Sequence, residues 1–197
     1  MKKTMTRLLA VLLILGCILA MTACGDKDDD KQTDKEESTS ASVEEGKNKE
    51  YTLAEGYKLY ENDDLSFAYP SSWTLTEGSS PIMTSSNGNN FNMSYELANK
   101  ENTAAYKSLT KDTFMDLIGN MLVAMGMTVS GVEVETKTND GGVEIIVCTY
   151  DATYVGKQMS FCQYLIVGED KHYTITATAV VPMDDAVEEL FKSIRVK

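Results

Sequence analysis

The chain has 197 residues, and its 30 acidic residues outnumber its 18 basic ones, which gives a formal net charge of −12 at pH 7. Such a balance argues against a nucleic-acid-binding protein, because neutralising phosphates needs a positive surface, and it also argues against electrostatic docking on anionic lipid. The length is sufficient for one domain with a sizeable core.

The first 23 residues have the pattern of a secretory signal peptide. Lys2, Lys3 and Arg7 form a basic start, the stretch 8–20 carries no charge, and small residues stand just before Cys24. A basic start, an apolar stretch of about 7–15 residues and small residues before a cut are typical of export signals. The apolar stretch is shorter than the roughly 20 residues that a membrane span needs. The sequence therefore predicts export and cleavage before Cys24.

Cys24 indicates that this export signal is of the lipoprotein type. The run Met21-Thr22-Ala23-Cys24 resembles the lipobox of bacterial lipoproteins, with Met21 where Leu is usual. The resemblance implies a diacylglycerol on Cys24, and two acyl chains hold a protein firmly on a membrane because each buried CH₂ contributes about 0.8 kcal/mol. One alternative is a box ending at Cys17, which would truncate the apolar stretch. The other is an ordinary signal with a coincidental cysteine. We expect lipid on Cys24 and a location on the extracytoplasmic face of the cell membrane.

The segment 24–50 after the cleavage site reads as the lipidated cysteine and an acidic tether. Residues 25–50 contain ten acids and five lysines, and one Val and one Ala are their only apolar side chains. Such a segment buries too little apolar surface to offset the entropy of ordering, so we expect it to be disordered. Its acids lack the spacing of a calcium-binding loop.

Residues 51–197 are expected to form one domain that begins with short strands. Their apolar residues alternate with period two, as in half-buried strands. The expected strands are 57–60, 65–69, 73–76, 82–83 and 91–97, with a turn at 87–90. Thr110 is then a candidate N-cap for a helix whose apolar residues recur at helical spacing, and Gly126 is its natural end.

The second half of the domain reads as a meander of long strands closed by a helix. The expected strands are 129–138, 143–154, 158–167 and 173–180, separated by turns at 140–142, 155–157 and 168–172. Pro182 begins the last helix, and the chain ends just past it. This order predicts an α+β fold with a mostly antiparallel sheet. Runs such as Ile145-Ile146-Val147 are apolar on both sides, which predicts helices on both faces of the sheet.

Several runs resemble PsbP-like domains, the family of the PsbP, Mog and DcrB type. They are a strand leading into Tyr69-Pro70-Ser71-Ser72-Trp73, the strand 173–179, and the ending Phe191-Lys192-Ser193-Ile194. The resemblance covers about residues 57–197. It implies an α/β/α sandwich and a non-enzymatic role as an accessory subunit of a larger partner. Trp73 is expected to fill the core, and no functional residue is carried over.

Few residues could carry chemistry. His172 is the only histidine and stands in a charged turn, where we expect it to be exposed and inert. No second histidine or Cys-x-x-Cys pair supports a zinc site, and no Gly-x-Ser-x-Gly elbow or phosphate-binding loop is present. The sequence therefore predicts no catalytic residue, metal or cofactor.

Cys148 and Cys162 are the other cysteines of the expected mature protein. They stand on neighbouring strands of a predicted hairpin, and an extracellular location permits a disulfide that would contribute about 3 kcal/mol. The alternative is a pair of small buried thiols. Both remain open at this point.

Together these features predict a membrane-anchored extracytoplasmic lipoprotein that acts as a non-enzymatic accessory or binding subunit of an envelope protein. The alternative is a lipoprotein that binds a small ligand or a cation in a groove between the sheet and a helix, using acidic side chains. The sequence identifies neither partner nor ligand.

Overall fold

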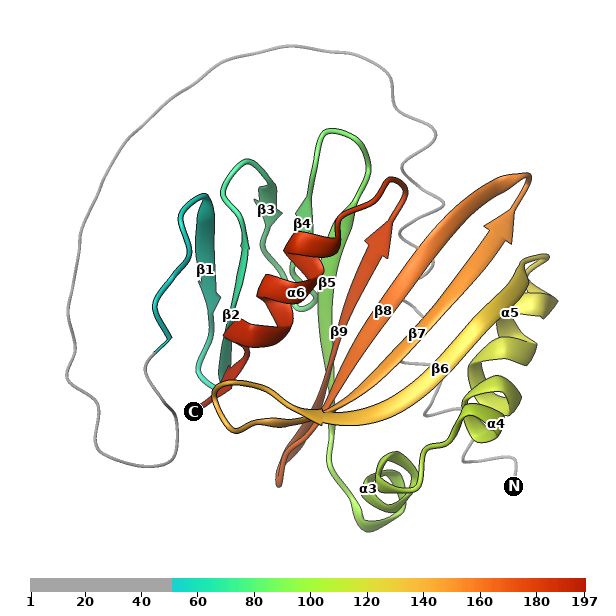
Figure 1. Ribbon diagram of the computed structural model, residues 1–197. Coiled ribbons are helices and arrows are strands. Elements are labelled where there is room, and N and C mark those ends of the chain that lie inside the picture. The colour runs from blue at the N-terminus through green and yellow to red at the C-terminus, as the bar shows by residue number, and fades with distance from the viewer. Residues whose placement is uncertain (1–50) are drawn as a thin grey trace. The chain divides into compact units, whose positions relative to one another are not determined.

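The computed structural model describes residues 51–197, so the predicted signal peptide, Cys24 and the tether lie outside the described residues. Seven strands form a large antiparallel sheet with the order β3-β4-β5-β9-β8-β7-β6 (Figure 1). They are β3 (Thr74–Thr76), β4 (Ile82–Thr84), β5 (Asn90–Leu97), β6 (Thr128–Thr138), β7 (Glu144–Tyr154), β8 (Lys157–Val167) and β9 (Lys171–Ala179). A small second sheet has the order β1-β2-β10, from β1 (Tyr57–Glu61), β2 (Leu65–Pro70) and β10 (Arg195–Val196).

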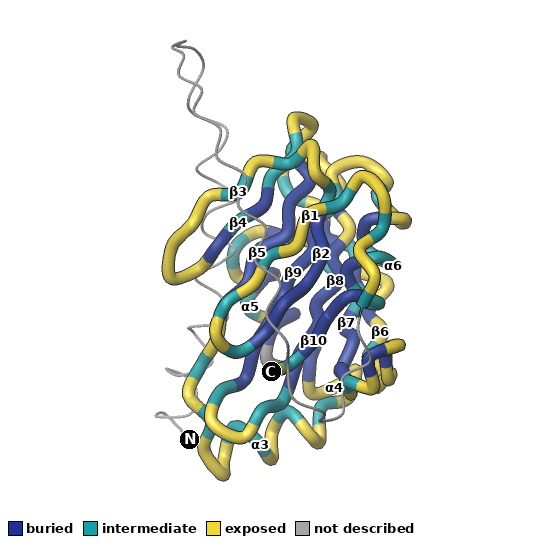
Figure 2. The backbone as a smooth tube through the Cα atoms, turned by 90° about the vertical axis from the view of Figure 1, so that its left-hand side faces the viewer, coloured by how far each residue is buried: buried dark blue, intermediate teal, exposed yellow. Residues whose placement is uncertain are grey.

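Helices cover both faces of the large sheet. One face packs against α6 (Asp184–Ser193), whose Ala186 and Leu190 join the main core with Tyr164 and Ile175. The other face is covered over β6 to β8 by α3 (Lys100–Lys107), α4 (Lys111–Phe114), the π-helix η1 (Met115–Gly119) and α5 (Asn120–Ala124). On this side the rings of Phe114 and Tyr150 lie 5.5 Å apart. The tube in Figure 2 shows buried backbone running through the strands between the two layers.

This arrangement confirms the α+β fold, the antiparallel sheet and the helices on both faces. Thr110 is the N-cap of α4, and Gly126 follows α5 with a φ of 84°. The strands match the expected ranges to within a few residues. Trp73 is half-buried and packs on Phe91, with ring centroids 4.7 Å apart.

Three details correct the sequence-based expectation. Helix α3 was not expected; Asn99 caps it and accepts from the backbone of Glu101 and Asn102. The expected helix from Thr110 is interrupted by the π-helix η1. A short strand that was not expected, β10, follows α6 and pairs with β2. No helix in the described part of the chain is long and apolar enough to cross a membrane.

Candidate binding groove

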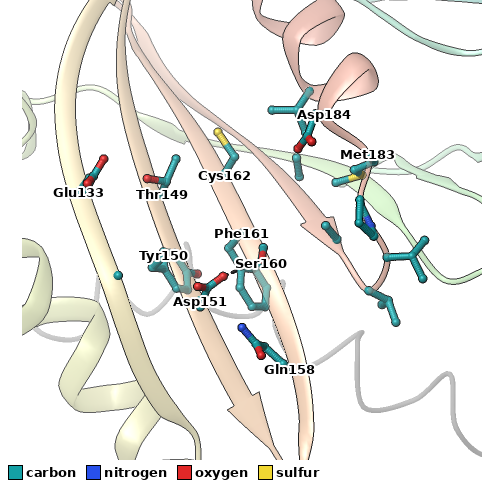
Figure 3. Close-up of a pocket in the computed structure, with 17 residues that line it drawn as sticks. Glu133, Thr149, Tyr150, Asp151, Gln158, Ser160, Phe161, Cys162, Met183 and Asp184 are labelled. Carbon is teal, nitrogen blue, oxygen red and sulfur yellow. Dashed lines mark hydrogen bonds between the residues drawn. The ribbon is translucent and has the colours of Figure 1, made fainter.

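A groove lies on the face of the large sheet that carries α6, between β6 to β9 and the N-terminal end of α6 (Figure 3). Its volume is about 670 Å³. We call it the α6 groove. The residues that line it include Glu133, Thr149, Tyr150, Asp151, Gln158, Ser160, Phe161, Cys162, Ala179, Val180, Val181, Met183 and Asp184.

The groove follows from a change of side-chain type along the strands. On β7 the α6-side residues Ile145 and Val147 are buried, whereas Thr149 and Asp151 on the same face are partly exposed. On β8 the exposed Ser160 pairs with Asp151 in the register. Alternate residues of a strand share a face, so the apolar contact with α6 gives way to a polar surface towards the strand ends.

The opposite wall is apolar and is held in place by one asparagine. The side chain of Asn89 accepts from the backbone amides of Val180 and Val181 and donates to the carbonyl of Val181, at 2.8, 3.0 and 3.0 Å. Asn89 is only 3% exposed, whereas Val180 and Val181 are 45% and 40% exposed. The two valines are therefore fixed at the surface by the fold.

The charge of the groove is negative. Glu133, Asp151 and Asp184 line it, and none of its lining residues is Lys or Arg. Ser160 donates to the carboxylate of Asp151 at 2.6 Å, as Figure 3 shows. Within the described residues, no three His, Cys, Asp or Glu side chains gather closely enough to hold a metal ion. The groove therefore combines an apolar wall with an acidic, hydrogen-bonding floor.

Cys162 lies at the edge of this groove as a protonated thiol. Burial raises its pKa to about 11, with a smaller opposing effect from a hydrogen bond to Tyr164. Burial likewise raises the pKa of Cys148 to about 12. A nucleophilic cysteine needs a lowered pKa, so neither thiol is activated.

The possible Cys148–Cys162 disulfide is not formed, and both cysteines are buried free thiols. In the register Cys148 faces Gln163, and Cys162 faces Thr149. The two cysteines are thus offset by one residue, which directs their side chains to opposite faces of the sheet. The structure therefore matches the alternative expectation, in which both cysteines are small buried thiols.

His172 also differs from expectation, because it is 3% exposed and belongs to β9 rather than to a turn. Its Nε2 lies 2.9 Å from Thr103 Oγ1 and 3.1 Å from Asn102 Oδ1, both on α3. The ring also makes an edge contact with Tyr106. Burial lowers the pKa of His172. It ties α3 to the face of the sheet opposite the α6 groove.

The candidate residues named from the sequence do not meet one another in a site. The sequence predicted an acidic groove beside a helix as one alternative, but Glu133, Asp151 and Asp184 were not identified as its lining. The polar positions at the ends of β7 and β8 were the available signal. They could be read only after the register was known.

Comparison with known proteins supports the fold. No family model matches the chain, and no curated protein matches its sequence. The solved structures include CyanoP, the cyanobacterial PsbP of Synechocystis sp. PCC 6803, at 13% identity and a TM-score of 0.56, covering 74% of this chain and 95% of that one. The fold is PsbP-like.

Two further structures resemble the chain more weakly. A protein of Bacteroides thetaiotaomicron VPI-5482 is 13% identical with a TM-score of 0.45, covering 68% of this chain and 45% of that one. LpqN of Mycobacterium tuberculosis, described as involved in cell envelope biogenesis, is 14% identical with a TM-score of 0.44, covering 72% and 90%.

Proposed function

We propose that this PsbP-like protein is a lipid-anchored, extracytoplasmic accessory protein that holds a segment of a partner protein in the α6 groove. The observation that carries the proposal is the amphipathic character of the groove, with an apolar wall and an acidic floor on one open surface. The complementary partner is an envelope protein that presents apolar and basic side chains together. Anchoring through lipid on Cys24 would keep the domain beside such a partner.

The chemistry of the groove supports binding rather than catalysis. Its thiol, Cys162, is held protonated by burial, which raises its pKa. His172, the only histidine of the chain, lies on the opposite face of the sheet. The thiol and the histidine therefore do not meet in the groove as the nucleophile and the base of an acyl-transfer site would. Exposed apolar side chains such as Val180 suit a docking surface instead.

Photocrosslinking in cells tests the proposal with the full chain. A benzophenone amino acid replaces Gln158, which is exposed and lines the groove, and in a control it replaces the exposed Lys58 on β1. We expect one dominant protein adduct from position 158 and none from position 58. Cys24→Ser removes the lipid site and should abolish the adduct. Equal labelling from both positions, or no protein adduct from position 158, would refute the proposal.

Charge reversal tests the complementarity of the partner. The double variant Glu133→Lys with Asp151→Lys reverses the floor of the groove and should reduce the adduct at least about tenfold, because like charges at a docked surface cost several kcal/mol. The control Glu144→Lys with Glu169→Lys makes the same change at exposed positions outside the groove. It should leave the adduct unchanged.

A further inference from the structure

A second, smaller pocket adjoins the α6 groove at the N-terminal end of α6. Its volume is about 410 Å³, and we call it the Trp73 pocket. It is lined by the start of β1, the end of β2 and the turn after it, the turn between β4 and β5, and the start of α6. Its lining includes Tyr57, Trp73, Met183, Asp184 and Asp185.

The fold holds the walls of the Trp73 pocket in place. The indole of Trp73 packs on the fully buried Phe91, with ring centroids 4.7 Å apart. The backbone amide of Trp73 donates to the carbonyl of Pro70 at 3.0 Å. Asn89 donates to the carbonyl of Val181, shortly before α6 begins. The aromatic wall and the start of α6 are therefore positioned before a ligand arrives, which reduces the ordering cost of binding.

The Trp73 pocket combines aromatic rings with carboxylates. Tyr57 and Trp73 are half-buried, whereas Asp184 and Asp185 are exposed at its rim, and none of the lining residues is Lys or Arg. Burial raises the pKa of Tyr57, and the negative charges of Glu189 and Asp185 raise it further. The carboxylates therefore produce a negative potential at this ring.

The N-terminus of α6 opposes that potential only in part. A helix N-terminus carries the equivalent of about +0.5 of an elementary charge. The first turn of α6 contains Asp184 and Asp185, each with a full formal negative charge. The net sign is negative, so the pocket favours cations over anions.

The shape and the hydrogen-bonding groups of the pocket favour a guanidinium among organic cations. A guanidinium is planar and weakly hydrated, so it stacks on an aromatic face such as that of Trp73. Its N–H groups donate to carboxylates, which Asp184 and Asp185 supply. A quaternary ammonium has no N–H to donate. The ammonium of lysine is compact and strongly hydrated, so it gains less from the aromatic wall.

We propose that the Trp73 pocket receives an arginine side chain of the partner segment that lies in the α6 groove. The inference rests on the proposed function, because groove and pocket share Pro182, Met183 and Asp184. Figure 3 shows Met183 and Asp184 beside the groove at the start of α6. A chain in the groove that continues past these residues reaches the pocket. The arginine then distinguishes the partner from other basic segments.

Trp73 is the only tryptophan of the chain, so its fluorescence reports on the pocket directly. The full-length protein in detergent is titrated at constant ionic strength with the Nα-acetyl amides of arginine, lysine and citrulline, the last being an uncharged analogue of arginine. The arginine ligand should change the emission saturably, with a dissociation constant of the order of 10 mM. The lysine ligand should bind at least about threefold more weakly, and the citrulline ligand at least about tenfold more weakly.

Asp185→Lys tests the position of binding, because Asp185 lines the Trp73 pocket and not the α6 groove. It should weaken binding of the arginine ligand at least about tenfold, since a repulsive charge replaces an attractive one. Asp185→Asn keeps the size of the side chain and should give an intermediate loss. The control Asp170→Lys makes the same charge change at an exposed position outside the pocket and should leave binding unchanged. Circular dichroism verifies that the variants fold.

In cells, Asp185→Lys should reduce the adduct formed from position 158 at least about fivefold, whereas Asp170→Lys should not. Absence of saturable binding of the arginine ligand, or equal binding of the citrulline ligand, overturns the inference. An adduct that survives Asp185→Lys also overturns it, because the pocket would then bind a free guanidinium compound and not the partner. If the wild type forms no adduct, the proposed function fails and the inference fails with it. An adduct without ligand binding refutes the inference alone.

Discussion

Asn139 is a small side chain whose loss should strongly destabilise the domain. It lies in the turn between β6 and β7 and is 6% exposed, and its side chain makes four hydrogen bonds. Its amide donates to the carbonyls of Phe191 and Ile194 at 2.9 and 2.8 Å, and its oxygen accepts from the amides of Gly141 and Val143 at 3.0 Å each. This one side chain joins the β6–β7 turn to the C-terminal end of α6.

Asn139→Ala should lower the free energy of unfolding by about 2–4 kcal/mol. Each hydrogen bond contributes about 1 kcal/mol net, and buried backbone groups left without partners add to the loss. For a domain of this size, the melting temperature should fall by roughly 4–16 °C. Urea denaturation monitored by circular dichroism measures the change. Asn120→Ala is the control, because Asn120 is exposed and makes one hydrogen bond, to Asp116. A loss below about 1 kcal/mol for Asn139→Ala would refute the reasoning.

Three further predictions concern single residues. Val155 has a φ of 48° and is 82% exposed. Asparagine tolerates this backbone conformation better than valine, so Val155→Asn should raise the free energy of unfolding, measured by urea titration, by about 1 kcal/mol. No gain in stability would show that Val155 is unstrained. Burial lowers the pKa of His172 in the folded protein. Its contribution to the free energy of unfolding should therefore be fully present above the ordinary pKa of 6.5 and decrease as the pH falls below it, because the unfolded chain then binds the proton more readily. The same dependence of stability on pH in His172→Gln would contradict this. Cys148 and Cys162 should both react with a thiol reagent after denaturation without reductant. If neither cysteine reacts, the two form a disulfide and the prediction is wrong.

The strands of the fold could be predicted from sequence because their signals are local. Alternation of apolar residues identified β2 and β5, and turn residues separated the strands. Helix α3 was missed because its sequence, KENTAAYK, has no apolar stripe and none of its residues is buried. Strand β10 was missed because a strand of two residues is too short to show an alternating pattern. Its pairing with β2, near the other end of the domain, could not be predicted from local sequence.

The candidate sites were harder to predict because they depend on register. Glu133, Thr149 and Ser160 are far apart in sequence and meet only when β6, β7 and β8 are aligned. The cysteines show how much one residue of register matters, since an offset of one moved Cys148 and Cys162 to opposite faces. His172 was expected in a turn because its neighbours are charged, but β9 begins at Lys171 and includes it.

Strand β9 contains the strongest disagreement between sequence pattern and structure. Its run Tyr173-Thr174-Ile175-Thr176-Ala177-Thr178 alternates apolar residues with threonine, a pattern typical of a strand with one face in water. Yet every residue of the run is buried, at 5% exposure or less. The threonine face of β9 has therefore been removed from water, and Thr178 Oγ1 on it has no hydrogen-bond partner among the described residues. Local pattern and tertiary structure agree nearly everywhere else in the domain, and such local conflicts tend to coincide with functional sites.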